Sequence, residues 1–342
     1  MSRRDVATMT AYTLELREAE VKLNQNESPF DLPRELKETV LAAALERPWN
    51  IYPDFESSML RGALANAYGF SAENILVGNG SNELLAAAVA TFVGPGTPVI
   101  YAKPTFSLYE KLVTIAGGIG LPVPIEPASG FLPLDDMLRA LDRCDDAVVI
   151  VCSPNNPTGG ILPARGLERL LAAGATVLFD RAYGDFAGDA LPPLHDRLVT
   201  FSTFSKAWGL AALRVGWLAT TAPTAREIRK VKLPYSLNVL SESIAAAALG
   251  RRAVRDANVA ATVAERARVA EAMRPLVEVF PSSANFIAFR PRRDAKGLFE
   301  ELCERGILIR DITHAIPNAL RVSIGDRAQN DRFLEALRDA TR

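Results

Sequence analysis

Residues 201–216 read FSTFSKAWGLAALRVG and place one lysine directly after a run that is typical of a buried strand. Lys206 is flanked by Phe204, Ala207 and Trp208, so its amine is not expected on a solvated face. Partial burial would lower the pKa of this amine and suit it to form a Schiff base with a carbonyl compound. A structural lysine with a buried stem and a charge that reaches water is the alternative.

Outward from this stretch, short apolar runs alternate with helical segments rich in alanine and leucine. Such alternation predicts an α/β fold, in which helices cover both faces of a mostly parallel sheet. We expect a large domain over residues 46–245, a smaller α+β C-terminal domain over 246–342, and an N-terminal segment, 1–45, that packs with the small domain. The predicted strands of the large domain are 75–77, 98–101, 147–152, 176–179, 199–203 and 216–220.

The residue pattern changes in the C-terminal part of the sequence, which starts with one long helical stretch rich in alanine and charged residues. This stretch covers residues 241–273 and is expected to break near Gly250, because glycine disfavours a helix interior. The elements predicted after it are a strand at 285–290, a helix at 295–305, strands at 308–310 and 320–324, and a helix at 331–341.

Two loops that follow predicted strands carry polar groups where ligands bind in an open parallel sheet. Residues 78–82, GNGSN, lead directly into a helix, and a helix N-terminus offers N–H groups to a phosphate. Residues 153–159, SPNNPTG, hold Asn156 in a rigid loop where its amide could donate to a ligand oxygen. For both loops an ordinary turn is the alternative.

Asp180 and Tyr183 follow the predicted strand 176–179. A carboxylate at the end of a buried strand is costly unless it is paired or hydrogen-bonded, although capping a helix would also explain it. Together the sequence offers an amine, a carboxylate for a pyridinium nitrogen, phenol and amide donors for a phenolate oxygen, and a phosphate site that includes Arg214. The ligand that needs this set is pyridoxal 5′-phosphate (PLP).

The composition limits the possible partners of the chain. Its 342 residues carry a formal net charge of −1, which gives no reason to expect nucleic acid or a membrane surface as a partner. Cys144, Cys152 and Cys303 lack metal-ligand spacing, so neither a metal site nor a disulfide framework is expected. Reduced thiols, and a basic N-terminus without an apolar core behind it, favour a cytoplasmic protein.

Nine strings, in order over nearly the whole chain, resemble the fold-type I PLP-dependent aminotransferases of class II. They are LNQNESP (23–29), IYPD (51–54), GNGSNE (78–83), KPTF (103–106), SPNNPTG (153–159), DRAYGDF (180–186), TFSKAWGLAALRVG (203–216), KLPYSLN (232–238) and LRVSIG (320–325). Within these enzymes the chain is most similar to the histidinol-phosphate aminotransferase family. The resemblance implies amino-group exchange between histidinol phosphate and 2-oxoglutarate in L-histidine biosynthesis, catalysed by a homodimer.

The resemblance also assigns roles to individual residues. Lys206 would carry PLP, Asp180 would pair with its pyridine nitrogen, and Tyr183 with Asn156 would hydrogen-bond its phenolate oxygen. The remaining cofactor contacts would come from Ser81, Asn82, Thr203, Ser205 and Arg214 at the phosphate, from Tyr52 of the partner subunit, and from Phe106 stacked on the ring. The implied substrate-binding residues are Tyr12, Asn156, Tyr235, Arg310 and Arg321.

The chain departs from the family pattern at a few positions. Arg181 stands where the family more often has glutamate, Phe106 replaces a tyrosine, and GSNE replaces GSDE or GADE. Three other functions stay open. An aromatic or broad-specificity aminotransferase shares most of these motifs, and a phosphothreonine-type decarboxylase shares the fold. A PLP-binding regulator would need a basic DNA-binding extension, which the near-neutral charge does not favour.

Overall fold

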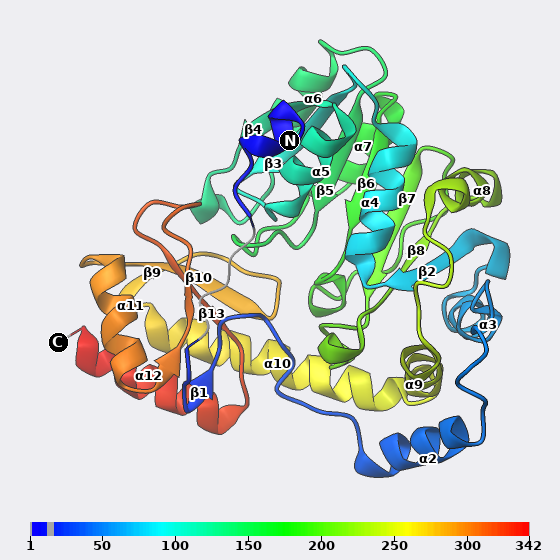
Figure 1. The fold of residues 1–342 in the computed structure, drawn as a ribbon. Helices are drawn as coiled ribbons and strands as arrows, with labels where there is room; N and C mark the ends of the chain where they lie inside the picture. Colours follow the sequence, from blue (N-terminus) through cyan, green and yellow to red (C-terminus); the bar gives the residue numbers. More distant parts are fainter. Residues whose placement is uncertain (1, 12–16, 342) are drawn as a thin grey trace.

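The computed structural model describes residues 2–11 and 17–341. Two main β-sheets, one of seven strands and one of four, lie beside each other with helices around both (Figure 1). In the described ranges no helix has both the length and the apolar character that a membrane span requires.

The seven-stranded sheet forms the centre of the larger part. Its strands, in spatial order, are β2 (Ile75–Asn79), β8 (Val215–Ala219), β7 (Leu198–Thr203), β6 (Thr176–Asp180), β5 (Val148–Cys152), β3 (Pro98–Lys103) and β4 (Ile119–Pro124). Only β8 runs antiparallel to its neighbours among these strands. All residues of β5, β7 and β8 are buried, which explains why β5 and β8 read as continuous apolar runs.

Helices cover both faces of this sheet, and alternate residues of one strand point to different helices. Leu76 packs with α4 (Ser81–Phe92), α5 (Leu108–Ala116) and α8 (Ala222–Val231), whereas Ile75 and Val77 pack with α3 (Ser58–Tyr68) and α9 (Val239–Leu249). The face opposite α4 also carries α6 (Leu134–Leu141) and α7 (Gly166–Ala172), and α2 (Arg34–Leu45) packs on α9.

The four-stranded sheet is antiparallel, with strand order β12 (Arg310–Asp311), β13 (Leu320–Ser323), β10 (Phe286–Pro291) and β9 (Val277–Val279). It packs with α10 (Arg252–Met273), α11 (Ala295–Glu304) and α12 (Arg327–Ala340) around one apolar core. The N-terminal strand β1 (Val21–Lys22) pairs in parallel with β11 (Ile307–Leu308), beside this core, and α1 (Arg4–Ala7) contacts α5.

The α/β fold that the sequence predicts is confirmed, and all six predicted strands of the large sheet are present. Three further strands, β1, β4 and β9, were not predicted from the sequence. β4 is an edge strand that contains Gly120, Pro122 and Pro124 and is largely exposed, so it lacks the apolar pattern of a buried strand. The expected long helix 241–273 is divided into α9 and α10 at Gly250–Arg251, and the expected strand 308–310 is divided between β11 and β12.

Candidate active site

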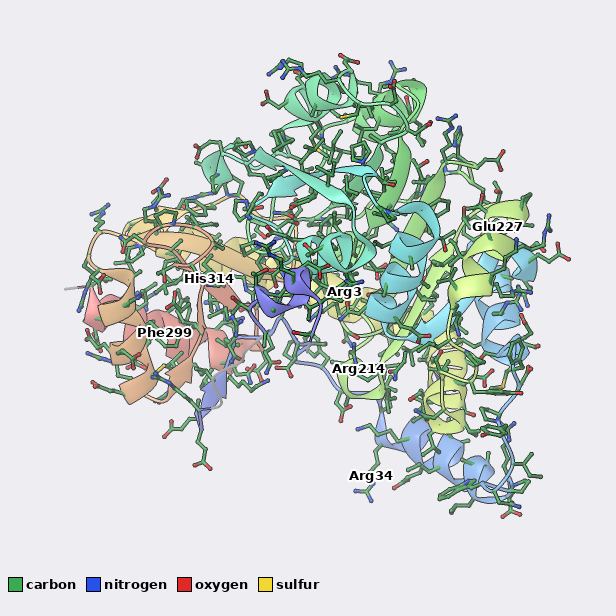
Figure 2. The ribbon with its side chains drawn as sticks, turned by 45° about the horizontal axis from the view of Figure 1, so that its top comes forward. Arg3, Arg34, Arg214, Glu227, Phe299 and His314 are labelled. Carbon is green, nitrogen blue, oxygen red and sulfur yellow. The ribbon has the colours of Figure 1, made fainter. Side chains whose placement is uncertain are left out.

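A cavity of about 1130 Å³ lies at the carboxyl ends of β5, β6 and β7, facing the four-stranded sheet. Asp180 at the end of β6 and Thr203 at the end of β7 line it from one side, and Arg321 on β13 lines it from the other. Figure 2 labels three further lining residues: Arg214 beside the large sheet, and His314 and Phe299 in the part that contains the small one. The cavity therefore lies where the parallel strands of an open sheet usually present their ligand-binding loops.

Lys206 lies three positions beyond the end of β7 and is partly buried in the cavity wall. Its Nζ donates a hydrogen bond to the carbonyl oxygen of Gln25 (2.9 Å) and lies 5.7 Å from the ring centre of Tyr183. Burial, followed by the positive charge of Arg321, lowers the pKa of Lys206 from 10.5 to about 7. A large share of this amine is therefore uncharged near neutral pH, which is the form that attacks a carbonyl carbon.

Asp180 is a buried carboxylate with two hydrogen bonds. Its Oδ2 accepts from the hydroxyl of Tyr109 (2.8 Å) and its Oδ1 accepts from the N–H of Ala182 (2.9 Å). Burial raises the pKa of Asp180, and these two hydrogen bonds oppose that rise. A cationic ring nitrogen bound in the cavity would restore a counter-charge to this carboxylate, so its position suits a pyridinium partner.

Tyr183 and Asn156 each form a hydrogen bond with a residue outside the large sheet. Asn26 Nδ2 donates to Tyr183 Oη (3.0 Å), and Arg321 Nη1 donates to Asn156 Oδ1 (2.5 Å). Burial raises the pKa of Tyr183 to about 12, against the opposing effects of Arg321 and of the Asn26 hydrogen bond. Because Asn156 Oδ1 accepts from Arg321, its amino group is the end that can donate to a ligand.

Arg321 itself is buried between the cavity and the small sheet. Its Nη2 donates to the carbonyl oxygen of Asn24 (2.8 Å), and its guanidinium carbon lies 5.1 Å from the ring centre of Phe286. These contacts hold a permanent positive charge next to both Asn156 and Lys206. A negatively charged part of a ligand would be attracted to this end of the cavity.

Donors that suit an anion gather at the N-terminus of α4; we call Ser81, Asn82, Thr203, Ser205 and Arg214 the candidate anion site. The helix begins at Ser81, and the first N–H groups of a helix have no intrahelical acceptor, so those of Ser81 and Asn82 are available to a ligand. Arg214 Nη1 donates to Ser205 Oγ (3.2 Å), and Thr203 Oγ1 lies 3.0 Å from the same oxygen. All five residues line the cavity.

Two glycines permit the close packing of this candidate anion site. Gly80 has a φ of +78°, and a Cβ there would lie 2.6 Å from Arg214 Nη2. A Cβ on Gly216 would lie 2.1 Å from the backbone nitrogen of Ser81. Together with Lys206 and Asp180, this cradle of N–H, hydroxyl and guanidinium donors fits the phosphate, carbonyl carbon and ring nitrogen of PLP.

The remaining predicted site residues are divided between the cavity and the surface. Phe106 and Arg310 line the cavity, with the Phe106 ring edge-to-face against Tyr109 at 5.7 Å. Tyr52 is 78% exposed and stacks on Tyr235 at 4.7 Å, and neither belongs to the described lining. Tyr12, also predicted to contact the substrate, lies outside the described residues.

Arg181, which the sequence left unexplained, is buried beside the cavity wall without lining it. Its Nη2 donates to the carbonyl oxygen of Asp189 (2.7 Å), and a Cβ on Gly184 would lie 2.9 Å from its guanidinium carbon. Burial lowers the pKa of Arg181, and the charges of Asp185 and Asp189 oppose this. Arg181 therefore stabilises the loop that follows Asp180 through its hydrogen bond to Asp189.

Three residues that hold the site together were not predicted from the sequence: Asn26, Tyr109 and Asn155. Asn155 is fully buried, donates to the Pro104 carbonyl (3.0 Å) and accepts from the Thr105 hydroxyl (2.6 Å), so it joins two loops of the cavity wall. Asn26 and Asn155 belong to the strings LNQNESP and SPNNPTG, and Tyr109 follows Phe106 by three positions across the turn that leads into α5. That spacing was the available signal.

Comparisons with known proteins identify relatives over nearly the full length. Residues 18–337 match the family model described as aminotransferase class I and II. A histidinol-phosphate aminotransferase from Chlorobaculum parvum is 37% identical over 330 residues, which cover 94% of this chain and 92% of that protein. One from Ruminiclostridium cellulolyticum is 31% identical over 346 residues, which cover 98% and 96% respectively.

A solved structure also resembles this chain. It is the histidinol-phosphate aminotransferase from Sinorhizobium meliloti in complex with pyridoxal-5′-phosphate, with a TM-score of 0.86 and 27% sequence identity. The match covers 95% of this chain and 92% of that one.

Proposed function

The chain belongs to the class I and II aminotransferase family, and on this basis we propose that it transfers an amino group between histidinol phosphate and 2-oxoglutarate with PLP as its cofactor. The relatives at 31–37% identity carry the name of this activity. The proposal rests above all on the meeting of Lys206, Asp180 and Tyr183 in one cavity beside the candidate anion site.

In this proposal the residues of the large sheet hold the cofactor. The candidate anion site of Ser81, Asn82, Thr203, Ser205 and Arg214 would bind its phosphate, and Phe106 would stack on its ring. Asp180 would keep the ring nitrogen protonated, since the buried carboxylate gains a counter-charge in return. Bound PLP supplies an electrophilic carbon for the substrate amine and an electron sink for the bonds around it.

Lys206 would move the proton on which the reaction depends. In the cofactor-free protein, burial lowers the pKa of the Lys206 amine to about 7, close to neutral pH. Such an amine accepts and returns protons with similar ease, as a general base and then a general acid must do. The hydrogen bond from Nζ to the Gln25 carbonyl oxygen, 2.9 Å away, holds this amine in place.

Anion recognition would select the substrate. Histidinol phosphate has a CH2–O–phosphate group where an amino acid has its α-carboxylate, so we propose that Arg321 receives the phosphate. Arg310, also in the lining, would supply a second cation for the distal carboxylate of glutamate and for the doubly charged phosphate of histidinol phosphate. Tyr12 would complete the distal end of the substrate site, whereas Tyr235, which stacks on Tyr52 outside the described lining, would do so at the site of the partner subunit.

We also propose a homodimer with shared active sites. The segment between α2 and α3, with the adjoining helix ends, exposes an apolar surface formed by Leu45, Trp49, Ile51, Tyr52, Phe55 and Met59. An apolar surface of this kind is typical of a contact with another protein. Tyr52 lies on it, away from the cavity of its own chain, and would reach the PLP phosphate of the partner. We place the enzyme in the cytoplasm, in keeping with three cysteines that no disulfide joins in the described residues.

The test is a set of single-turnover spectra of the PLP-loaded protein with histidinol phosphate, glutamate and phenylalanine in turn. We expect rapid loss of the visible cofactor band with the first two. Borohydride reduction followed by peptide mass spectrometry should place the cofactor on Lys206. A preference for phenylalanine over histidinol phosphate would favour an aromatic aminotransferase instead, and an adduct on another lysine would refute the assignment of Lys206.

A further inference from the structure

Asn26 lies in the segment between β1 and α2, yet its side chain is buried between the two sheets. Its φ of +54° is in the left-handed region, which asparagine adopts more readily than most residues. It forms hydrogen bonds with Tyr183 beside the large sheet, with Ser323 at the end of β13 and with Asn285 just before β10. One residue of the N-terminal segment therefore connects a cavity residue to β13 and to the residue that precedes β10.

The directions of these hydrogen bonds follow from the chemistry of the partners. Ser323 Oγ accepts from the backbone N–H of Asn26 (2.8 Å), and its own hydroxyl proton is directed to Asn26 Oδ1 (3.0 Å). The amide is thereby oriented with its amino group toward Tyr183 Oη, at 3.0 Å. The Tyr183 oxygen accepts this bond and keeps its own proton to donate elsewhere.

We propose that Asn26 is a positioning residue that fixes the Tyr183 hydroxyl as a hydrogen-bond donor into the cavity, and that Ser323 fixes Asn26. The inference depends on the proposed function, because the acceptor would be the ring oxygen of bound PLP. The opposite arrangement, in which Tyr183 donates to Asn26, would withdraw that proton from the cofactor. The two arrangements differ in the direction of the hydrogen bond between Asn26 and Tyr183. They therefore predict opposite effects of removing Asn26 on the hydrogen bond that Tyr183 donates to the cofactor.

A spectroscopic titration separates them. A hydrogen bond donated to the anionic ring oxygen of PLP stabilises that anion and lowers the proton affinity of the nitrogen that joins the cofactor to Lys206. The pH midpoint of the visible cofactor band reports this proton affinity without any turnover. Weakening the donor should therefore move the midpoint to higher pH.

Two substitutions at Asn26 tolerate the positive φ and change the donor in different ways. Asn26→Gly removes the side chain, and we expect the midpoint to rise by about one pH unit, as for a weakened hydrogen bond to a charged group. Asn26→Asp replaces the donor with an acceptor that would attract the Tyr183 proton, so its midpoint should rise further. Ser323→Ala removes the hydroxyl that orients the Asn26 amide and should give a smaller rise of the midpoint. This variant tests the proposal even if Asn26→Asp fails to fold.

Asn318→Gly is the matched control. Asn318 also has a φ of +54° and holds a loop of the small-sheet part through hydrogen bonds from Ala295 and to Arg293, but it is exposed and outside the described cavity lining. Its midpoint should equal that of the wild type. If Asn26 had a purely structural role, Asn26→Gly and Asn318→Gly would both lower the thermal stability. Neither variant would then change the pH midpoint of the cofactor band.

The decisive comparison uses Tyr183→Phe. In that background Asn26→Gly should cause no further change of the midpoint, because the hydroxyl through which it acts is absent. An equal shift in both backgrounds, no shift in any Asn26 or Ser323 variant, or a shift to lower pH would each overturn the proposal. A wild-type protein that forms no visible band with PLP would instead refute the proposed function.

Discussion

At the scale of single residues, Lys206 has a pKa that burial has lowered to about 7, whereas the unfolded chain holds the same amine at its ordinary value of 10.5. Between these two values the unfolded state binds more protons than the folded state. The free energy of unfolding of the cofactor-free protein therefore rises with pH across this window. The destabilising effect of the buried amine is fully present below pH 7 and is lost as the pH approaches 10.5.

Because the buried amine destabilises the fold at neutral pH, Lys206→Met should stabilise the cofactor-free protein. Methionine has a similar length and no charge to desolvate, so the free energy of unfolding should rise at pH 7 by at most about 4 kcal/mol. The gain should shrink steadily between pH 7 and 10. Urea unfolding of the two cofactor-free proteins at several pH values measures it. A gain that does not depend on pH would show that the amine is not titrating in this range.

A second residue-scale prediction concerns Arg310. Loss of one charge-assisted contact costs about 1.5–3 kcal/mol, so Arg310→Ala should lower kcat/KM for histidinol phosphate and glutamate by roughly 10- to 150-fold. Turnover of phenylalanine, where present, should be spared because its side chain offers no second anion. The control is Arg292→Ala, which removes an exposed arginine outside the described lining. If both anionic substrates keep their wild-type kinetics in Arg310→Ala, Arg310 does not bind them.

The sequence allowed the positions of some site residues to be predicted but not those of others. Lys206 and Asp180 follow predicted parallel strands, and the ends of such strands meet at one edge of a sheet, so their proximity could be expected. Asn26 reaches Tyr183 across 157 positions and Ser323 across 297, and it belongs to neither a predicted strand nor a predicted helix. No local pattern encodes such contacts, because tertiary packing alone creates them.

At the scale of secondary-structure elements, the close approach of β8 to the start of α4 depends on Gly216. A Cβ there would meet the backbone of Gly80 and Ser81, which cannot turn aside as a flexible side chain could. Gly216→Ala should therefore lower the free energy of unfolding by about 1–3 kcal/mol, as overpacking usually does. It should also weaken PLP binding at least tenfold, since the displaced helix N-terminus belongs to the proposed phosphate site.

Gly62→Ala provides the matched control. Gly62 lies within α3, and a Cβ there would have no neighbour within 4 Å. Because alanine favours a helix interior over glycine by about 1 kcal/mol, this variant should be as stable as the wild type or more so, with unchanged PLP affinity. Equilibrium titration with PLP and thermal unfolding compare both variants. Wild-type PLP affinity in Gly216→Ala would mean that the candidate anion site does not depend on this packing.

The accuracy of the predicted elements followed the strength of their apolar pattern. β5, with five buried apolar residues, was predicted to within one residue, whereas the exposed edge strand β4 was missed. The division of the chain into segments 1–45, 46–245 and 246–342 stays a prediction.

At the scale of the whole molecule, the proposed homodimer requires each active site to contain residues of two chains. Lys206→Ala and Tyr52→Phe should each impair activity, the first by orders of magnitude. Heterodimers of the two variants should recover activity, because one of their two sites then combines an intact Lys206 with an intact Tyr52 of the partner subunit. Activity is measured after the variants are mixed, unfolded and refolded together. Absence of recovery in verified heterodimers, with both parents defective, would place Tyr52 outside the partner's site.

The pairing of the N-terminal segment with the small sheet has a consequence for biosynthesis. The ribosome releases Asn26 long before Ser323, its partner 297 positions later. At a synthesis rate of about 5–20 residues per second, roughly 15–60 s pass between the synthesis of Asn26 and that of Ser323. During this interval the cavity lacks β13 and therefore Arg321. PLP that meets the nascent chain encounters the wall formed by the large sheet alone, so the mature site is completed only after residue 323 has left the ribosome.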